Sequence, residues 1–338
     1  MIKPLLALCD TDETYLGRLY EYLKENLKLS FEIAVFSAIS PLMEFAKENK
    51  VALLVISENA LWDLKTEAKA FGFSNILVLD EEANLVMEDE TTDGSCLMHA
   101  SKYQPAKGIV DSIVEFCAER ADDFEGVGCE FVSEEGKVIG LFTPLARAGQ
   151  TSLALKMGEV LSRKARTIFL SFESFSTLPR TLGLDKEGTI ADLMYYAECE
   201  ESKFTLHLEK IKNSVGNLDV IAPAKTAMQL KEISYDNLKK LVNLLVKEAG
   251  YEYVVLDLKD YPEGFFDILR LCNKLFTIVR PTEADAYKQE LFEDVLRENG
   301  YEDVIADLTK VNVADLKDSR LMTNTAMTLL KKEGVIIE

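Results

Sequence analysis

The sequence is poor in the residues from which metal centres and disulfide frameworks are built. Its 338 residues include 2 histidines and 6 cysteines, and the cysteines are scattered with no C-x-x-C pair. A zinc cage needs closely spaced Cys and His ligands, and a disulfide framework is typical of short, cysteine-rich chains. The sequence therefore predicts neither, and it fits a reducing compartment.

Long apolar runs are also missing. No stretch approaches the ~20 residues that a helix needs to cross a bilayer. The first residues, MIKPLLALCD, reach acidic positions too soon for a signal peptide. The helical stretch near the end, SRLMTNTAMTLLKKEG, has too few cations for a membrane-targeting helix. We therefore expect a cytoplasmic protein that does not insert directly into a membrane.

Positive charge is scarce. The chain has 38 Lys and Arg against 58 Asp and Glu, which gives a net charge of −20. Such a field repels phosphate backbones, so general nucleic-acid binding is disfavoured. The 48% of hydrophobic residues can form substantial cores, and at ~100–200 residues per domain the length predicts two domains.

Apolar runs alternate with helical patterns throughout the chain. In residues 1–120 the runs that predict strands are 5–9, 31–36, 51–56, 76–79 and 96–100. Leu16, Leu19 and Leu23 between the first two fall on one helical face. Strands alternating with helices predict an α/β fold with a doubly wound parallel sheet. We expect the lone Trp62 to pack inside; an exposed aromatic at an interface is the alternative.

Residues 121–136 interrupt this alternation. They are acidic and contain glycine, so we interpret them as a linker, with a short strand at CEFV. A second alternation over 137–338 predicts another parallel sheet. Its strands are expected at 137–142, 167–172, 218–223, 251–258 and 275–280, and its helices at 151–163, 189–197, 234–249, 263–273 and 284–298.

The stretch KVIGLFTPLARAGQTSLALKMGEVL, residues 137–161, predicts a strand, a tight loop and a helix. A phosphate-binding loop has this form, because backbone amides and a helix N-terminus attract anions. Such a loop ends in a lysine for the outer phosphates and a Ser or Thr for Mg²⁺. Gly149, Thr151 and Ser152 are in register with that ending, but Gln150 takes the place of the lysine and Arg147 is the loop's one cation.

Several segments of the second domain resemble the ParA/MinD family of deviant P-loop ATPases. LARAGQTS, Leu145 to Ser152, lies over the family's KGGxGKTT-like loop. LSFESF places Glu173 at the family's acidic switch motif, and YEYVVLDLKDYP places Asp257 at the magnesium-side aspartate. The resemblance covers roughly residues 137–320. It implies a nucleotide site formed by Leu145, Ala146, Arg147, Ala148, Gly149, Gln150, Thr151 and Ser152, with Mg²⁺ near Thr151 and Asp257.

Two departures from that family concern its lysines. The signature lysine, which reaches across a dimer, falls at Leu145, and the P-loop lysine falls at Gln150. Loss of one preorganised donor commonly costs ~10²–10³-fold in rate. We therefore expect binding of ATP and Mg²⁺ with weak or absent hydrolysis, and name Glu173 and Asp257 as catalytic candidates only.

The front domain resembles the receivers of response regulators. LCDTDE supplies Asp10 and Asp12 at the end of the first strand, and SKYQ supplies Lys102 after the last. Ser57 stands where a receiver has its phosphoacceptor aspartate, so the resemblance is to a flavodoxin-like pseudo-receiver. The alternatives are that Asp10 and Asp12 cap the first helix, that Lys102 is a solvated loop cation, and that Ser57 only ends its strand.

A receiver-like domain before a degenerate ParA/MinD-like domain resembles the TadZ/CpaE family. That resemblance implies a homodimeric factor for assembly and polar placement of a tight-adherence (Flp-type) pilus or related secretion machinery, whose components would be its partners. It also implies a location at the cell pole or the inner membrane face through those partners. The alternatives are an active positioning ATPase and a nucleotide-free signalling adaptor made of two pseudo-enzymes.

Overall fold

The computed structural model describes residues 3–67, 72–81, 87–88, 95–124, 127, 136–259, 262–316 and 318–336. The chain divides into two compact units, one of Met1–Glu130 with Thr205–Lys210, the other of Phe131–Phe204 with Ile211–Glu338. The expected strand at CEFV, 129–132, lies outside the described residues. Within the expected linker, Ala121 and Phe124 are buried in the core of the first unit.

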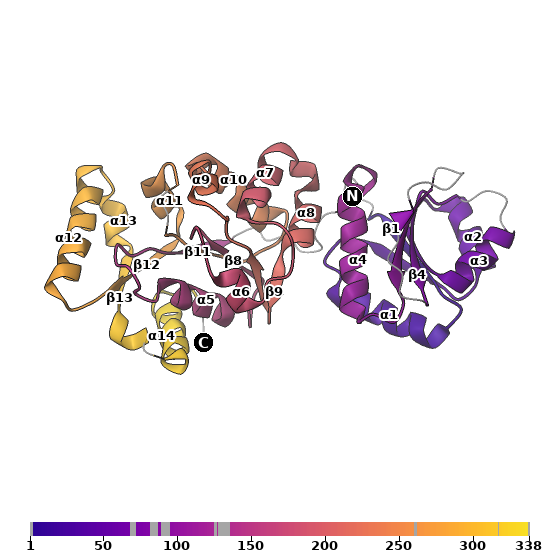
Figure 1. Ribbon diagram of the computed structural model, residues 1–338, viewed down its shortest axis with the longest axis horizontal. Helices are drawn as coiled ribbons and strands as arrows, with labels where there is room; N and C mark the ends of the chain where they lie inside the picture. The colour runs from indigo at the N-terminus through magenta and orange to yellow at the C-terminus, as the bar shows by residue number, and fades with distance from the viewer. Residues whose placement is uncertain are drawn as a thin grey trace. The chain divides into compact units, whose positions relative to one another are not determined.

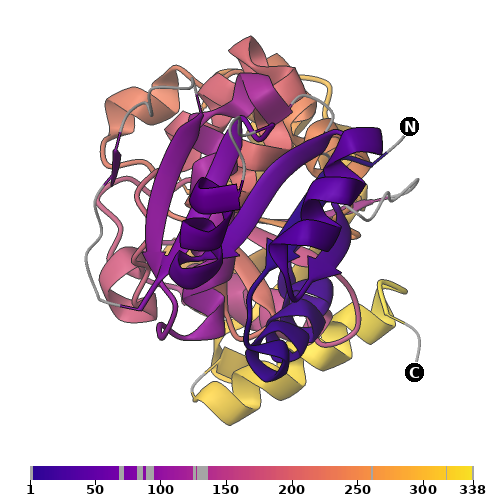
Figure 2. The ribbon, with the colours of Figure 1, turned by 90° about the vertical axis from the view of Figure 1, so that its right-hand side faces the viewer.

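The first unit is a sheet with helices on both faces (Figures 1 and 2). Its strand order is β2-β1-β3-β4-β6-β5, and the first five of these pair in parallel, which is the flavodoxin-like order with β6 as fifth strand. The strands are β1 Leu5–Cys9, β2 Glu32–Phe36, β3 Val51–Ser57, β4 Asn75–Asp80, β5 Met87–Glu88 and β6 Cys96–Ser101, and the helices α1 Glu13–Asn26, α2 Ile39–Glu48, α3 Glu58–Glu67, α4 Ala106–Glu119 and η1 Ala121–Phe124.

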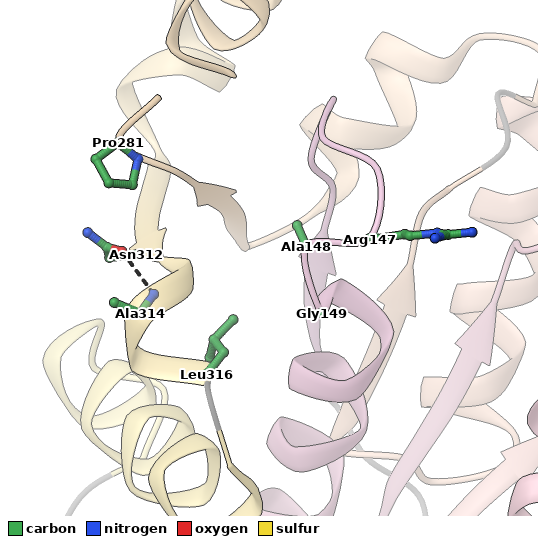
Figure 3. A pocket seen from close by; sticks show the side chains of 7 residues that line it. All are labelled: Arg147, Ala148, Gly149, Pro281, Asn312, Ala314 and Leu316. Atoms are coloured by element: carbon green, nitrogen blue, oxygen red, sulfur yellow. Dashed lines mark hydrogen bonds between the residues drawn. The ribbon is translucent and has the colours of Figure 1, made fainter. Parts of the chain in front are cut away.

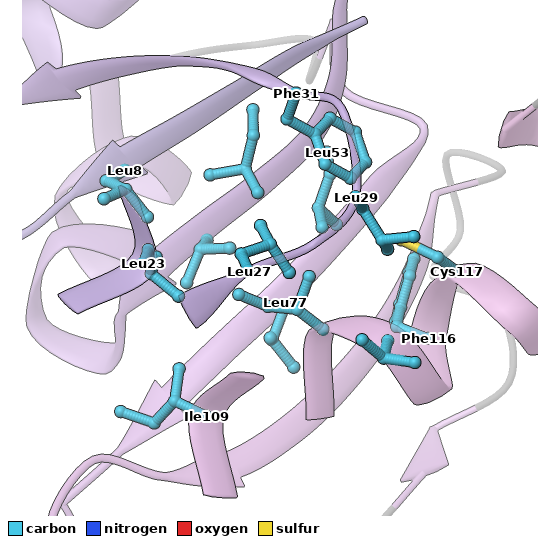
Figure 4. Packing of buried hydrophobic residues seen from close by; sticks show 14 of the residues in the cluster. Leu8, Leu23, Leu27, Leu29, Phe31, Leu53, Leu77, Ile109, Phe116 and Cys117 are labelled. Atoms are coloured by element: carbon cyan, nitrogen blue, oxygen red, sulfur yellow. The ribbon is translucent and has the colours of Figure 1, made fainter. Parts of the chain in front are cut away.

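Alternate residues of these strands enter two separate cores, as the period of two in a strand requires. On β1, Leu6 and Leu8 face the core shared with α1 and α4 (Figure 4). Ala7 and Cys9 face the core shared with α2 and α3. The sheet is therefore buried on both faces, which explains why its strands are continuous apolar runs in the sequence.

Trp62 on α3 departs from the prediction. Its side chain is 70% exposed, so the expectation that it packs inside is wrong; a role at an interface stays a prediction. The helix α3 was not among the predicted elements, and neither was the short antiparallel strand β5.

The second unit has the strand order β13-β12-β7-β11-β8-β10-β9. All neighbouring pairs are parallel except the hairpin of β9 and β10. The strands are β7 Lys137–Leu141, β8 Thr167–Ser171, β9 Asn213–Val215, β10 Leu218–Ile221, β11 Tyr253–Asp257, β12 Lys274–Val279 and β13 Leu308–Asn312. Each of the five predicted strands is present, whereas β9 and β13 were not predicted.

Helices cover both faces of this second sheet. In Figure 1, α5 and α14 lie on one face, and α7, α10 and α11 lie on the other. The helices of this unit are α5 Gln150–Leu161, α6 Leu178–Leu182, α7 Ile190–Cys199, η2 Glu201–Lys203, α9 Ala227–Lys231, α10 Tyr235–Lys247, α11 Phe265–Leu271, α12 Glu283–Glu298, α13 Glu302–Ala306, η3 Val313–Leu316 and α14 Ser319–Lys332. The remaining helix, α8 Phe204–Ile211, belongs to the first unit except for its two end residues. Among the described residues, no helix is long and apolar enough to span a bilayer.

The chain changes direction across the sheet at strand β7, which is third in the order of seven. Its neighbours are β11 on one side and β12 on the other. Ligands of open α/β sheets bind at such a switch point, outside the carboxyl ends of the strands. The loop 142–149 leaves β7 at this point, so the topology places it where a ligand site is expected.

Candidate functional site

The loop after β7 ends in a left-handed residue that starts helix α5. Gly149 has φ of +86° and is the N-cap of α5, a conformation that glycine adopts without steric cost. Among the described residues, no side chain caps this helix. The first amides of α5 are thus left to water or a ligand, and the helix dipole favours an anion there.

Arg147 also has a left-handed backbone, with φ of +53°. Its conformation is supported by Arg280, which follows β12 and donates from Nη2 to the carbonyl oxygens of Arg147 at 2.6 Å and Ala146 at 3.1 Å. The loop is therefore held from outside by a cation that had not been singled out in the sequence. These two carbonyls therefore have their hydrogen bonds within the protein.

Gln150 is turned inward and is 5% exposed. Its Nε2 donates to Asp257 Oδ1 at 2.7 Å and to the carbonyl of Leu258 at 3.1 Å, while its Oε1 accepts from the backbone amide of Thr143 at 2.8 Å. An amide group has two donor hydrogens, and both are used here. The Gln150 side chain therefore joins the ends of β7 and β11 and has no side-chain donor left for a ligand.

Asp257, at the end of β11, is fully buried. Its Oδ2 accepts from Ser171 Oγ at 2.9 Å, and Ser171 is its register partner on β8. Burial raises the pKa of this carboxyl, although Gln150, Thr151, Lys259 and Ser171 each act in the opposite direction. The effect of desolvation on the pKa is larger than that of the hydrogen bonds, because the nearest partners are neutral and cannot offset a buried charge as a cation would.

The hydroxyl of Thr151 is the unsatisfied atom of this site. Its Oγ1 is buried and has no partner with hydrogen-bond geometry among the described residues, although it lies near enough to favour the ionised form of Asp257. A buried hydroxyl without a partner costs free energy. Thr151 therefore lies close to Asp257, and the adjacent Ser152 is exposed.

The other predicted loop residues divide into buried and exposed positions. Leu145 and Ala148 are 5% and 4% exposed and belong to the core of the unit, so only their backbone could meet a ligand. Ala146 and Arg147 are exposed. Among the described residues of this loop, only Arg147 carries a positive charge.

A cleft of about 500 Å³ opens beside the loop. It is lined by Arg147, Ala148, Gly149, Pro281, Asn312, Ala314 and Leu316. Figure 3 shows that the Arg147 side chain extends away from the residues on the opposite wall. The walls come from the loops after β7, β12 and β13, so the cleft lies at the carboxyl edge of the sheet. Its volume suits a small-molecule ligand.

Glu173 lies beyond the end of β8 and forms an ion pair with Lys259, whose Nζ is 2.5 Å from Glu173 Oε1. Glu173 Oε2 also accepts from Ser176 Oγ at 3.0 Å. The predicted acidic position is thus occupied by a paired carboxylate. Lys259 was not named from the sequence, although its place two residues after Asp257 was a usable signal.

The first unit has a second polar cluster, at the carboxyl edge of its own sheet. Asp10 and Lys102 are 3% and 6% exposed, and Lys102 Nζ is 2.8 Å from Asp10 Oδ2. The alternative of a solvated Lys102 is therefore wrong. Asp12 is the cap of α1, since its Oδ1 accepts from the amides of Thr14 and Tyr15 at 3.0 Å.

Ser57 ends β3 and is 1% exposed. The register pairs Cys9 with Ile56, so Asp10 and Ser57 follow at the same level of the sheet. Ser57 Oγ has no hydrogen-bond partner among the described residues. The three receiver-like positions, Asp10, Ser57 and Lys102, thus lie at one edge. No group of three or more His, Cys, Asp or Glu in the described part of the chain is arranged to hold a metal ion.

Comparison with known proteins gives resemblance of fold at low identity. No protein-family model and no curated protein matches the chain. A ParA family ATPase from Chlorobium tepidum TLS is similar with 14% identity and a TM-score of 0.44, over 58% of this chain and 92% of that one. A plasmid partition protein from Borrelia burgdorferi is similar with 14% identity and a TM-score of 0.45, over 59% and 100%.

A third similar structure is the septum site-determining protein MinD, complexed with Mg-ADP, from Pyrococcus horikoshii OT3. It has 14% identity and a TM-score of 0.38, over 52% of this chain and 68% of that one. At such identities and TM-scores, these likenesses carry no argument about function. The functional conclusion therefore rests on the geometry described above.

Proposed function

We propose that this chain is an assembly and localisation factor of the TadZ/CpaE type for a tight-adherence (Flp-type) pilus or related secretion machinery. It binds ATP with weak or no hydrolysis and acts as a homodimeric platform. The observation that carries the nucleotide part is the unpartnered Thr151 hydroxyl beside Asp257, at the start of a helix without a side-chain cap. The pilus part rests on the order of a receiver-like and a ParA/MinD-like domain.

The residues present suit part of a magnesium nucleotide. The amides of the loop and of the first turn of α5 would hold phosphate oxygens. Thr151 and Asp257 would hold Mg²⁺, which favours hydroxyl and carboxylate oxygens. A bound divalent cation would also favour the ionised form of Asp257, against the effect of its burial. The adjacent cleft of about 500 Å³ has room for the nucleoside.

The same residues argue against rapid hydrolysis. Leu145 is in the core and Gln150 is engaged in three hydrogen bonds. Neither position can therefore supply the positive charge that stabilises a transferring phosphoryl group. At about 10²–10³-fold per lost donor, the expected turnover is far below that of a lysine-bearing loop.

In the first unit, the proposed role is docking rather than phosphotransfer. Ser57 is buried and is an alcohol, so it cannot form the acyl phosphate of a receiver. Lys102 and Asp10, at the other two receiver-like positions, form an ion pair with each other. The surface of this unit carries the exposed Trp62, and exposed tryptophans are enriched at protein interfaces.

Calorimetric titration with ATP tests the nucleotide part, with Mg²⁺ and with a chelator, together with phosphate release from the same sample. We expect binding that is tighter with Mg²⁺ and little release. Thr151→Val should remove the Mg²⁺-dependent increment, whereas Thr181→Val, at an exposed position on α6, should not. Rapid phosphate release would instead support an active positioning ATPase.

A nucleotide-free adaptor is the second candidate, and one observation favours it. Gln150 already joins β7 to β11 without any ligand, so the loop has internal support. In that case the titration gives no heat with or without Mg²⁺. The pilus part is tested in cells that lack this chain, by counting pili and by imaging a fluorescent fusion at the poles. Unchanged pilus number would contradict it.

A further inference from the structure

Lys259 is a cation at the carboxyl edge of the second sheet. Asp257 on β11 pairs in register with Ser171 on β8, and Lys259 and Glu173 each follow their strand partner by two residues. Their side chains meet above the strand ends, 2.5 Å apart and 34% and 30% exposed. The pair is therefore held together but reachable from solvent.

Lys259 also follows directly on the buried part of the site. The preceding residue, Leu258, donates its amide to the carbonyl of Leu141 at 2.9 Å, and its own carbonyl accepts from Gln150 Nε2 at 3.1 Å. The backbone that carries Lys259 is therefore bonded both to the end of β7 and to the first residue of α5. Gln150 cannot contribute a donor there, because both of its amide hydrogens are already used.

We propose that Lys259 is the phosphate-binding cation of this loop, in place of the lysine that Gln150 has replaced. When ATP binds, the Lys259 ammonium breaks its ion pair with Glu173 and forms an ion pair with the terminal phosphate. This inference rests on the proposed nucleotide binding. Arg147 is the competing cation, but its backbone is fixed by Arg280 and its side chain extends away from the opposite wall of the cleft (Figure 3).

The exchange has a consequence for the segment after β8. Glu173 accepts from Ser176, and Ser176 Oγ in turn accepts from the amide of Leu178 at 3.3 Å. Between them Phe175 is 79% exposed, with a left-handed φ of +52°. Release of Lys259 leaves the Glu173 carboxylate unpaired beside this strained residue. Phosphate binding would thus alter the surroundings of the exposed Phe175 ring.

Titration calorimetry of wild type and variants with Mg-ATP and Mg-ADP tests the proposal. Hydrogen bonds to charged groups correspond to about tenfold or more in affinity. We expect Lys259→Met to weaken ATP binding at least tenfold and ADP binding less, and Arg147→Met to weaken ATP binding by less than about threefold. Glu173→Gln, which removes the competing carboxylate, should tighten ATP binding.

The outcomes separate the two proposals. If wild type binds ATP and Lys259→Met, folded by circular dichroism, binds within threefold of it, the role of Lys259 is overturned and the nucleotide site stands. A larger loss in Arg147→Met than in Lys259→Met would also overturn it. If wild type itself binds no nucleotide, the proposed function fails, and the role of Lys259 fails with it.

Discussion

Each of the two units buries an aspartate at the carboxyl edge of a parallel sheet, but the partners of the two carboxylates differ. In the first unit, Asp10 is paired with the ammonium of Lys102 at 2.8 Å, and both side chains are almost fully buried. In the second unit, Asp257 receives hydrogen bonds from the neutral groups of Gln150 and Ser171. The buried carboxylate of the first unit is thus neutralised by a cation in direct contact, whereas the carboxylate of Asp257 in the second unit has no such contact among the described residues.

The difference shows what a missing lysine does to a buried carboxylate. Neutral donors satisfy the lone pairs of Asp257, yet burial still raises its pKa. Asp219 in the same sheet is a useful contrast. Burial acts to raise its pKa too, but Lys212, Tyr251, Ser214 and Arg166 outweigh it and the pKa is lowered. A cation in direct contact, Lys212 Nζ at 3.3 Å from Asp219 Oδ2, distinguishes Asp219 from Asp257.

The largest expected effect comes from breaking the ion pair of the first unit. Lys102→Met should destabilise that unit by about 3–5 kcal/mol, because it leaves the buried Asp10 carboxylate without its cation. Urea unfolding followed by circular dichroism measures this. Adding Asp10→Asn should restore part of the loss, and Lys107→Met, at an exposed position on α4, should have little effect. A loss below about 1 kcal/mol would mean that the pair contributes no more than a surface salt bridge.

Replacing Asp257 should raise the stability of the protein, by less than Lys102→Met lowers it. Because burial raises its pKa above the ordinary 3.8, its stabilising contribution is present below about pH 3.8 and is lost as pH rises through the native value. Asp257→Asn keeps the shape and can still bond Gln150 and Ser171. It should therefore be more stable than wild type at neutral pH, on the order of 1 kcal/mol, and the gain should vanish in acid.

Asp219→Asn sharpens this prediction because its sign is reversed. A lowered pKa contributes stability above pH 3.8 that is lost as pH falls through the native value. This variant should therefore be less stable than wild type at neutral pH. Chemical denaturation of both variants between pH 3 and 8 checks the two signs. Parallel pH curves for the two variants would contradict the assigned causes.

The smallest effect concerns the outer support of the loop. Arg280→Met removes two hydrogen bonds to the carbonyls of Ala146 and Arg147, at a partly exposed position. We expect about 0.5 kcal/mol of lost stability, the low end for a hydrogen bond, because these bonds are exposed. Faster amide exchange at residues 146–149 is the specific readout, and Arg163→Met, at an exposed position after α5, is the control. Unchanged exchange would show that the loop does not depend on Arg280.

Much of the fold could be predicted because its central strands are buried on both faces. Runs such as LLALC, and YVVL before Asp257, consist of hydrophobic residues, and the structure confirms them in β1 and β11. The strands that were missed are edge or near-edge strands with polar residues, such as LTKVN of β13 and NSV of β9. An edge strand needs fewer apolar residues, so its sequence signal is weak.

The site could be predicted only in part, for a different reason. The loop position follows from the strand, loop and helix pattern of residues 137–161, and the pairing of Thr151 with Asp257 was implied by a family resemblance. The inward turn of Gln150 depends on Asp257, 107 residues away, and the Lys259 pair depends on Glu173, 86 residues away. Side-chain direction is set by such distant partners, and a single sequence gives no measure of them.

The exposed position of Trp62 gives the protein an optical property. The chain contains one tryptophan, and its indole ring on α3 is mostly in contact with water. Indole emission in water is shifted to long wavelength, and it moves to shorter wavelength when the ring is covered. A partner that binds over α3 would therefore shift the emission wavelength of the intrinsic fluorescence without any label. Thr151, Asp257 and Lys259 lie in the other unit, which contains no tryptophan.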